Sequence, residues 1–310
     1  MLLDFYGLHE QPFGPTPDPR YLYPSSSHLE AAASLAYGIE SGCGFLALIA
    51  RPGMGKTCLL FQLLDELKAT ARTAFLFQTR CNEREFLQYL LEDLGVAGGS
   101  DNLASIHARL NALLIEEAAA GRRVVVVIDE AQNLSEPILE MVRMLSNFET
   151  PRAKLLQVVL AGQPQLAAKL RRPALAQLLQ RISVLRCLTP LTPSEVSGFV
   201  RHRLNVAGYT GDSPFPAETL ALIAKASRGI PRLINDICFN CLTLGFAVGQ
   251  RTVDTKMLEE VLGDLSLDSL MRQVLPPPVR RAPKQLRPFS LLPSLLRNFR
   301  FLPQHRPANR

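Results

Sequence analysis

The segment that most constrains the fold is a glycine-containing loop that joins an apolar run to a helical pattern. Residues 45–50 are apolar, residues 51–55 form a loop of Gly and Pro, and residues 56–68 have helical periodicity. The loop and the start of the helix read ARPGMGKT over residues 50–57. Glycines in such a turn let backbone N–H groups converge on phosphate oxygens without a Cβ atom in the way. This strand–loop–helix unit therefore predicts a phosphate-binding loop in an α/β domain.

The pattern of such loops predicts a role for each polar residue. It ordinarily starts with Gly, and Ala50 stands at that place here. Lys56 is expected to contact the β- and γ-phosphates of a nucleotide, and Thr57 to ligate Mg²⁺. The N-terminus of the helix would add a partial positive charge. The expected nucleotide-binding residues of the loop are Ala50, Arg51, Pro52, Gly53, Met54, Gly55, Lys56, Thr57 and Cys58.

A second chemical element follows an unbroken β-branched run at residues 124–128, which is typical of a strand buried on both faces. Asp129 comes directly after this run, where a carboxylate can reach hydrated Mg²⁺. Glu130 is then placed to orient and deprotonate an attacking water molecule. Together with the loop, these residues predict hydrolysis of a nucleoside triphosphate with Mg²⁺.

The remaining pattern predicts an α/β domain followed by an all-helical one. Strand patterns at 73–78, 155–160 and 182–187 alternate with helical ones, which favours a mainly parallel sheet with helices on both faces. After Pro190, four helical patterns follow without a strand signal, at 193–207, 217–228, 231–248 and 254–264. Cys238 and Cys241 in the third of these are expected to be core residues. We predict an irregular segment near the nucleotide at 1–27, the α/β domain at 28–190, a helical lid at 191–266, and a disordered tail at 267–310.

The charges are distributed unevenly. The formal net charge is +6, yet residues 270–310 hold nine Lys and Arg and no Asp or Glu, which leaves 25 basic against 28 acidic residues in 1–269. The tail is also rich in Pro and mixes Leu and Phe pairs with Arg297 and Arg300 at its end. Such a segment could bind an anionic membrane surface, a partner groove or nucleic acid.

Six scattered cysteines indicate a reducing compartment rather than a disulfide framework. The first residues have no basic segment followed by a long apolar stretch, so no signal peptide is expected, and no window predicts a transmembrane helix. We therefore expect a cytoplasmic protein, with the inner face of the membrane as a site of peripheral attachment.

Several longer strings resemble one family, the AAA+ ATPases of the ExeA/GspA type, which are linked to general secretion. The resemblance covers about residues 1–265. It rests on the leader FYGLHEQPFGPTPDPRYLY at 5–23, on His28 and the helix ending YGI (37–39), and on the strings DEAQNL (129–134), LAGQPQL (160–166), QRI (180–182) and GIPRLIN (229–235). It implies a P-loop NTPase fold of the AAA+ class, with ATP and Mg²⁺ as cofactors.

The resemblance also implies roles for residues outside the loop. Gln163 matches a sensor beside the γ-phosphate, Arg181 an arginine finger that reaches a neighbouring subunit, and Arg232 a second sensor in the lid. A structural role for each is the alternative. The leader would lie against adenine, with Pro19, Arg20, Tyr21 and Tyr23 as candidates or as packing residues. His28 would either face the ligand or cap the start of its helix.

These observations favour an ATP-hydrolysing molecular switch that works as a homo-oligomer on a protein partner in a secretion or envelope-assembly system. The alternative is a DNA-binding AAA+ regulator of the transposition-helper type, in which the basic tail would contact duplex DNA. A third interpretation is a scaffold that binds ATP and barely hydrolyses it, which Ala50 in place of Gly would favour.

Overall fold

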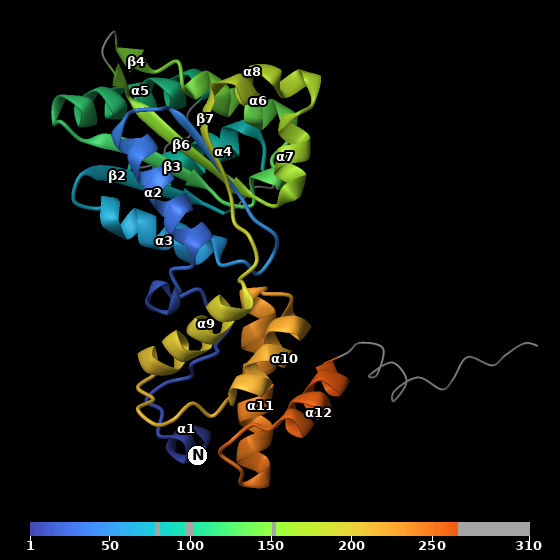
Figure 1. Ribbon diagram of the computed structural model, residues 1–310. Coiled ribbons are helices and arrows are strands. Elements are labelled where there is room, and N and C mark those ends of the chain that lie inside the picture. Colours follow the sequence, from blue (N-terminus) through green and yellow to red (C-terminus); the bar gives the residue numbers. More distant parts are fainter. Residues whose placement is uncertain (78–80, 97–101, 151–152, 266–310) are drawn as a thin grey trace, which may run out of the picture.

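The structure is a computed structural model that describes residues 1–77, 81–96, 102–150 and 153–265. It consists of an α/β part and a helical part that lies below the sheet in the view of Figure 1. The tail at 267–310, with its predicted disorder and its basic residues, lies outside the described residues.

The α/β part is built on a five-stranded parallel sheet with the strand order β2-β3-β6-β1-β7. Its strands are β1 (Phe45–Ile49), β2 (Ala71–Leu76), β3 (Arg123–Ile128), β6 (Leu156–Gly162) and β7 (Ile182–Cys187). Every residue of β1 and β6 is buried, as expected for central strands covered on both faces. The predicted parallel α/β sheet is therefore confirmed, and the carboxyl ends of β1, β3 and β6 meet at one edge.

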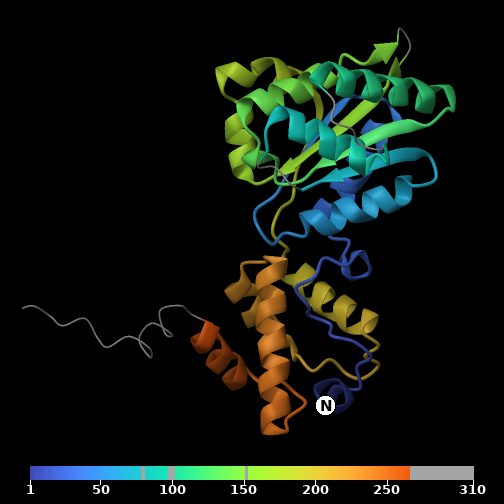
Figure 2. The same cartoon turned by 180° about the vertical axis from the view of Figure 1, so that it is seen from behind.

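Helices cover both faces of this sheet, as Figures 1 and 2 show from opposite sides. On one face, α2 (Ser26–Glu40) and α3 (Lys56–Leu67) pack against strand residues such as Leu46 and Val127. The other face is covered by α4 (Glu83–Asp93), α5 (Leu103–Ala119), α6 (Glu136–Leu145), α7 (Pro164–Leu170) and α8 (Ala176–Arg181). Successive residues of each strand point to opposite faces, so each strand contributes to both cores.

The helical part contains α9 (Pro193–Val206), α10 (Ala217–Ser227), α11 (Pro231–Val248) and α12 (Thr255–Leu265) around one hydrophobic core. Cys238 and Cys241 are fully buried in it, as predicted. The N-terminal leader lies along these helices in Figures 1 and 2, and Tyr6 and Tyr21 belong to the same core.

The prediction of an irregular segment at 1–27 is wrong in two places. It forms α1 (Leu2–Tyr6) and the 3-10 turn η1 (Pro19–Tyr21). The first is anchored by burial of Tyr6, and in the second Asp18 accepts a hydrogen bond from the Arg20 backbone N–H at 2.9 Å. Distant packing thus orders a segment whose local composition predicts a loop.

Short elements complete the described chain. A hairpin of β4 (Glu149–Thr150) and β5 (Ala153–Lys154) follows α6, and the 3-10 turns η2 (Ala131–Asn133) and η3 (Pro173–Leu175) flank α6 and α8. No helix in the described ranges combines the length and the apolar character that crossing a bilayer requires.

Candidate nucleotide site

The loop between β1 and α3 has the backbone geometry of a phosphate cradle. Gly53 and Gly55 have φ angles of 78° and 84°, which residues with a side chain rarely adopt. A Cβ atom on Gly53 would lie 2.6 Å from the Cβ of Arg232, so space also requires glycine there. Gly55 is the N-cap of α3, and therefore the unpaired N–H groups of that helix end open onto the loop.

Lys56, the first residue of α3, meets the two carboxylates that follow β3. Its ammonium contacts Asp129 Oδ1 and lies 3.2 Å from Glu130 Oε1. Thr57 donates its hydroxyl to Asp129 Oδ2 at 2.9 Å. Burial lowers the pKa of Lys56, although Glu130 partly opposes this shift. The structure thus brings together all four residues that were predicted to contact phosphate, metal or the attacking water.

The Glu130 carboxylate is held by two amide side chains. Gln163, directly after β6, donates to Glu130 Oε2 at 3.0 Å, and Gln132 donates to the same oxygen. The backbone of Glu130 is left-handed, with φ 51°, a conformation that is uncommon outside glycine. Burial alone would raise the pKa of Glu130, but these hydrogen bonds and the charge of Lys56 hold it below the usual value.

A cavity of about 380 Å³ adjoins this cluster and lies between the loop, the leader and α11. Of the predicted residues, it is lined by Arg51, Pro52, Gly53, Met54, Gly55, Lys56, Thr57, Cys58, Glu130, Gln163 and Arg232. Asp129 lies buried behind Lys56 and Thr57. Ala50 is buried in the sheet core, and its N–H donates to the Gly162 carbonyl at 2.9 Å.

The residues present fit a nucleoside triphosphate with Mg²⁺. A Cβ atom at Gly53 would meet Arg232, which lines the same cavity, and Lys56 offers a buried cation to phosphates there. Thr57 Oγ1 and the Asp129 carboxylate supply the hard oxygen atoms that Mg²⁺ prefers, and this ion ordinarily uses only one or two protein oxygens beside phosphate and water.

Arg181 does not reach the cavity of its own chain. At the end of α8, its guanidinium donates to the Arg143 carbonyl at 3.3 Å, to Asn147 Oδ1 at 2.9 Å and to Ser146 Oγ. The next residue, Ile182, pairs with Phe45 at the start of β1. Arg181 therefore lies at the edge of the sheet opposite the phosphate loop.

The leader reaches the cavity only in part. Tyr21 and Tyr23 line it, whereas Pro19 and Arg20 are not among the lining residues. Arg20 is exposed and pairs with Glu10 at 3.0 Å and with Asp18 at 2.7 Å. His28 also lines the cavity, and the interpretation of His28 as a helix cap is wrong, because Ser25 is the N-cap of α2 and the ring lies inside the first turn.

Two residues of the site were missed from the sequence. Gln132 holds Glu130 but stands in a stretch that resembles a simple turn. Arg203 of α9 is buried on the cavity wall, where its guanidinium lies 4.6 Å from the Tyr21 ring centre and donates to the Pro12 carbonyl at 2.6 Å. Burial lowers the pKa of Arg203. A single Arg on an amphipathic helix ordinarily faces solvent, so only the contact with the leader identifies it.

Comparisons with known proteins identify a family and a relative of this chain. The family described as an AAA domain matches residues 39–170. General secretion pathway protein A of Aeromonas hydrophila is 40% identical over 268 residues, which are 86% of this chain and 48% of that protein. The chain therefore spans about half the length of this curated relative.

Solved structures show the same fold at low sequence identity. Cdc6p from Pyrobaculum aerophilum superposes with a TM-score of 0.63 at 19% identity, over 84% of this chain and 73% of that one. The ORC2 protein of Aeropyrum pernix, in its ADPNP–ADP complexes, gives a TM-score of 0.64 at 16% identity, over 82% and 71%.

Proposed function

Because this chain belongs to the AAA ATPases of the general secretion pathway protein A type, we propose that it binds ATP with Mg²⁺ and hydrolyses it to ADP and phosphate. The observation that carries the proposal is the contact of Lys56 with Asp129 and Glu130 beside a phosphate loop that only glycines can form. The Aeromonas relative supports membership of the family, and the geometry of these residues supports binding and hydrolysis of ATP.

Binding would use the loop amides and Lys56. A buried ammonium needs a negative partner, which Asp129 and Glu130 supply in this structure. Phosphate oxygens would take over that role when ATP binds, which releases Glu130. Thr57 and Asp129 would hold Mg²⁺, which neutralises developing charge on the phosphate oxygens. Arg232 would approach the phosphates from the lid side of the cavity.

Glu130 would then accept a proton from the attacking water. Its lowered pKa keeps it ionised at neutral pH, as a general base requires. Gln163 and Gln132 would fix the direction of its carboxylate, and an exact orientation matters because proton transfer demands hydrogen-bond reach.

ATP turnover of two variants tests this assignment. We expect Lys56→Ala to lose both ATP binding and turnover, because the cation at the loop floor is removed. Glu130→Gln should keep ATP binding and lose at least about 100-fold in turnover, because the amide cannot accept the water proton. Phosphate release and binding of a fluorescent ATP analogue would be measured on the purified protein.

Matched controls lie at the far end of α3, away from the phosphate loop. Glu66 belongs to the last turn of this helix and Lys68 is its C-cap; both are exposed, so Lys68→Ala and Glu66→Gln should leave binding and turnover unchanged. Unchanged turnover in Lys56→Ala or Glu130→Gln would overturn the hydrolytic assignment. Binding without any turnover in the unaltered protein would favour the scaffold interpretation instead.

The output of the switch would be a conformational change that acts on a protein partner in a secretion or envelope-assembly system. The name of the Aeromonas relative supports this direction. We also propose a homo-oligomer, since the predicted arginine finger lies far from the cavity of its own chain. No disulfide joins any of the six cysteines, all of which lie in the described part of the chain. This supports the cytoplasm as the site of action, with peripheral attachment to the inner face of the membrane.

Duplex DNA is the alternative partner. The observation that favours it is the group of nine basic and no acidic residues at 270–310, although the rest of the chain is mildly acidic. Turnover should then rise with added duplex DNA, and binding should fall with a log–log salt slope of up to about 8. Turnover indifferent to DNA at low salt would leave the secretion-type partner as the proposal.

A further inference from the structure

The leader is part of the core of the lid. The Tyr6 hydroxyl donates to the Leu242 carbonyl of α11 at 3.1 Å, and the His9 N–H donates to the Ala207 carbonyl after α9 at 2.8 Å. Arg203 of α9 donates to the Pro12 carbonyl. These contacts, with the shared apolar core, join residues before α2 to the helical part rather than to the sheet.

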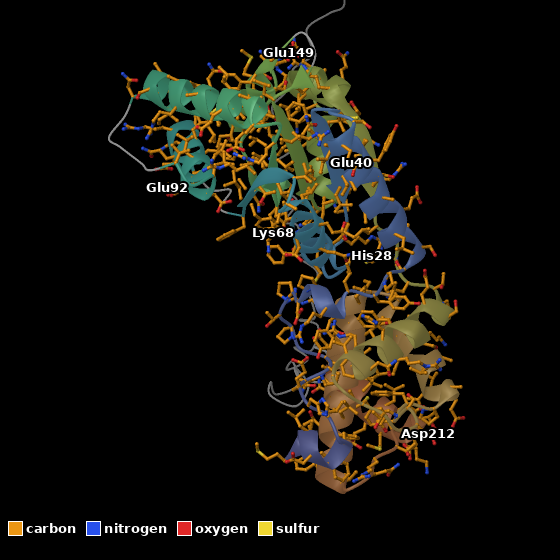
Figure 3. All side chains as sticks on the ribbon, turned by 90° about the vertical axis from the view of Figure 1, so that its left-hand side faces the viewer. His28, Glu40, Lys68, Glu92, Glu149 and Asp212 are labelled. Carbon is orange, nitrogen blue, oxygen red and sulfur yellow. The ribbon has the colours of Figure 1, made fainter. Side chains whose placement is uncertain are left out.

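The chain crosses from this unit to the α/β part at the first turn of α2. Ser25 precedes that helix, and the Ser26 backbone N–H and hydroxyl both donate to Glu195 Oε1 of α9 at 3.0 Å. His28 is labelled at this junction in Figure 3, where the helical part meets the α/β part. A movement of the leader and the lid would therefore also move the residues around His28.

The His28 ring connects this crossing to the phosphate loop. The side chain is only 3% exposed, and Nε2 lies 2.9 Å from the Met54 carbonyl oxygen. A carbonyl only accepts, so Nε2 carries the hydrogen, and in a neutral ring Nδ1 then accepts from the Ser25 hydroxyl at 2.6 Å. Both ring nitrogens are satisfied in this form, and burial lowers the pKa of His28, which keeps the ring neutral.

The bond to Met54 sets the direction of a loop amide. Met54 stands between the two glycines with positive φ angles. A peptide is planar and trans, so its N–H points opposite to its C=O. When His28 holds the Met54 carbonyl, the N–H of Gly55 must point away from the ring. This N–H belongs to the cradle, at the N-cap of α3, and is a group that the loop offers to a phosphate.

We propose that His28 is a positioning residue for the phosphate loop. Its ring fixes the Met54–Gly55 peptide, so that the position of the leader and the lid affects the affinity of the loop for nucleotide. This inference rests on the proposed ATP binding and deepens it. Without the ring, the peptide between two flexible glycines can rotate, and its N–H is then no longer held in the direction that a phosphate needs. The effect falls on nucleotide affinity rather than on the hydrolysis step, because Glu130 and its amide partners do not contact His28.

Two substitutions separate the contacts of the ring. Glutamine can place its Nε2 near the position of the histidine Nε2 and restore the donor to Met54. Asparagine is too short and can reach only the Ser25 side. We expect His28→Asn to weaken binding of a fluorescent ATP analogue by about 10-fold, as for loss of a buried hydrogen bond, and His28→Gln to recover most of that loss. The turnover number at saturating ATP should stay within about 2-fold in both.

The matched control is His107→Ala on α5, which lies outside the cavity and should bind ATP as the unaltered protein does. Thermal unfolding of all variants shows whether they fold. Equal affinity of His28→Asn and the unaltered protein would overturn the inference, and so would equal losses in the Gln and Asn variants. No ATP binding by the unaltered protein itself would instead overturn the proposed function.

Discussion

At the scale of single residues, the Glu130 carboxylate is oriented by groups from three segments. Lys56 comes from α3, Gln132 from the turn after β3, and Gln163 from the position directly after β6. Two of the three partners are neutral amides, which orient a carboxylate without neutralising it. The arrangement suits a base that must remain charged until a water proton arrives.

Gln163→Ala should therefore impair hydrolysis more than binding. The Gln163 hydrogen bond favours the ionised carboxylate and lowers its pKa, so its removal raises the pKa of Glu130. We expect the turnover number to fall by about 10-fold, and the acid limb of its pH profile to move to higher pH. Exposed Gln62 on α3 gives the control, Gln62→Ala. An unshifted acid limb would contradict this role for Gln163.

The sequence predicted the residues that carry the chemistry of this site better than the residues that hold them in place. Lys56, Thr57, Asp129 and Glu130 belong to local strings whose spacing follows from a strand that ends at a loop. The support comes from contacts between distant segments, such as Gln132 with Gln163 and His28 with Met54. No local periodicity encodes such pairs, which is also why buried Arg203 was missed.

At the scale of elements, Glu195 connects the first turns of two helices. It completes the capping box of α9 with Thr192, and it accepts hydrogen bonds from Ser26 at the start of α2. Backbone N–H groups of Thr192 and Ser26 lower the pKa of Glu195 to about 2. The same carboxylate therefore compensates the unpaired donors of both helix ends.

Glu195→Gln should destabilise the protein in a pH-dependent way. The unfolded pKa of 4.5 exceeds the folded value of about 2, so the stabilisation is complete above pH 4.5 and is lost as the pH falls towards 2. At about pH 7 we expect the free energy of unfolding to fall by about 1 kcal/mol, because the amide keeps a neutral acceptor. Urea unfolding at neutral and acid pH measures this, with exposed Glu259→Gln as control. A difference that persists unchanged at acid pH would contradict the assignment.

Long elements were predicted within a few residues, because their apolar periodicity is strong. The strand pattern at 73–78 became β2 at Ala71–Leu76, and the last strand matches fully. The short helices α7 and α8 and the β4–β5 hairpin were missed, since a few residues carry too little periodicity. The order of the strands, and the packing of the leader on the lid, follow from contacts that no single segment contains.

At the scale of the whole molecule, the nucleotide cavity and Arg181 lie at opposite edges of the sheet. Arg181 is held by neutral oxygen acceptors at the end of α6, and the carboxylates of Glu140 and Glu149 lie near enough to interact with its charge. A guanidinium that donates its hydrogen bonds to neutral oxygen atoms can exchange them for a phosphate of another subunit. The arrangement supports a site completed by two copies of the chain.

Mixing two variants tests such a shared site. Arg181→Ala keeps Glu130, and Glu130→Gln keeps Arg181, so each alone should turn over ATP poorly. A mixed assembly contains contacts at which an intact Glu130 faces an intact Arg181, and there turnover should return. For a dimer mixed at random in equal amounts, about a quarter of the activity is expected, because half of the dimers are mixed and one of their two sites is complete. The sites without an arginine finger contribute little, since such a residue is worth orders of magnitude in rate. Turnover of the unaltered protein should also rise with protein concentration. The control is Arg172→Ala on the exposed surface, which should turn over ATP as the unaltered protein does. Turnover of the mixture equal to the sum of the two separate variants would show that Arg181 serves no neighbouring nucleotide.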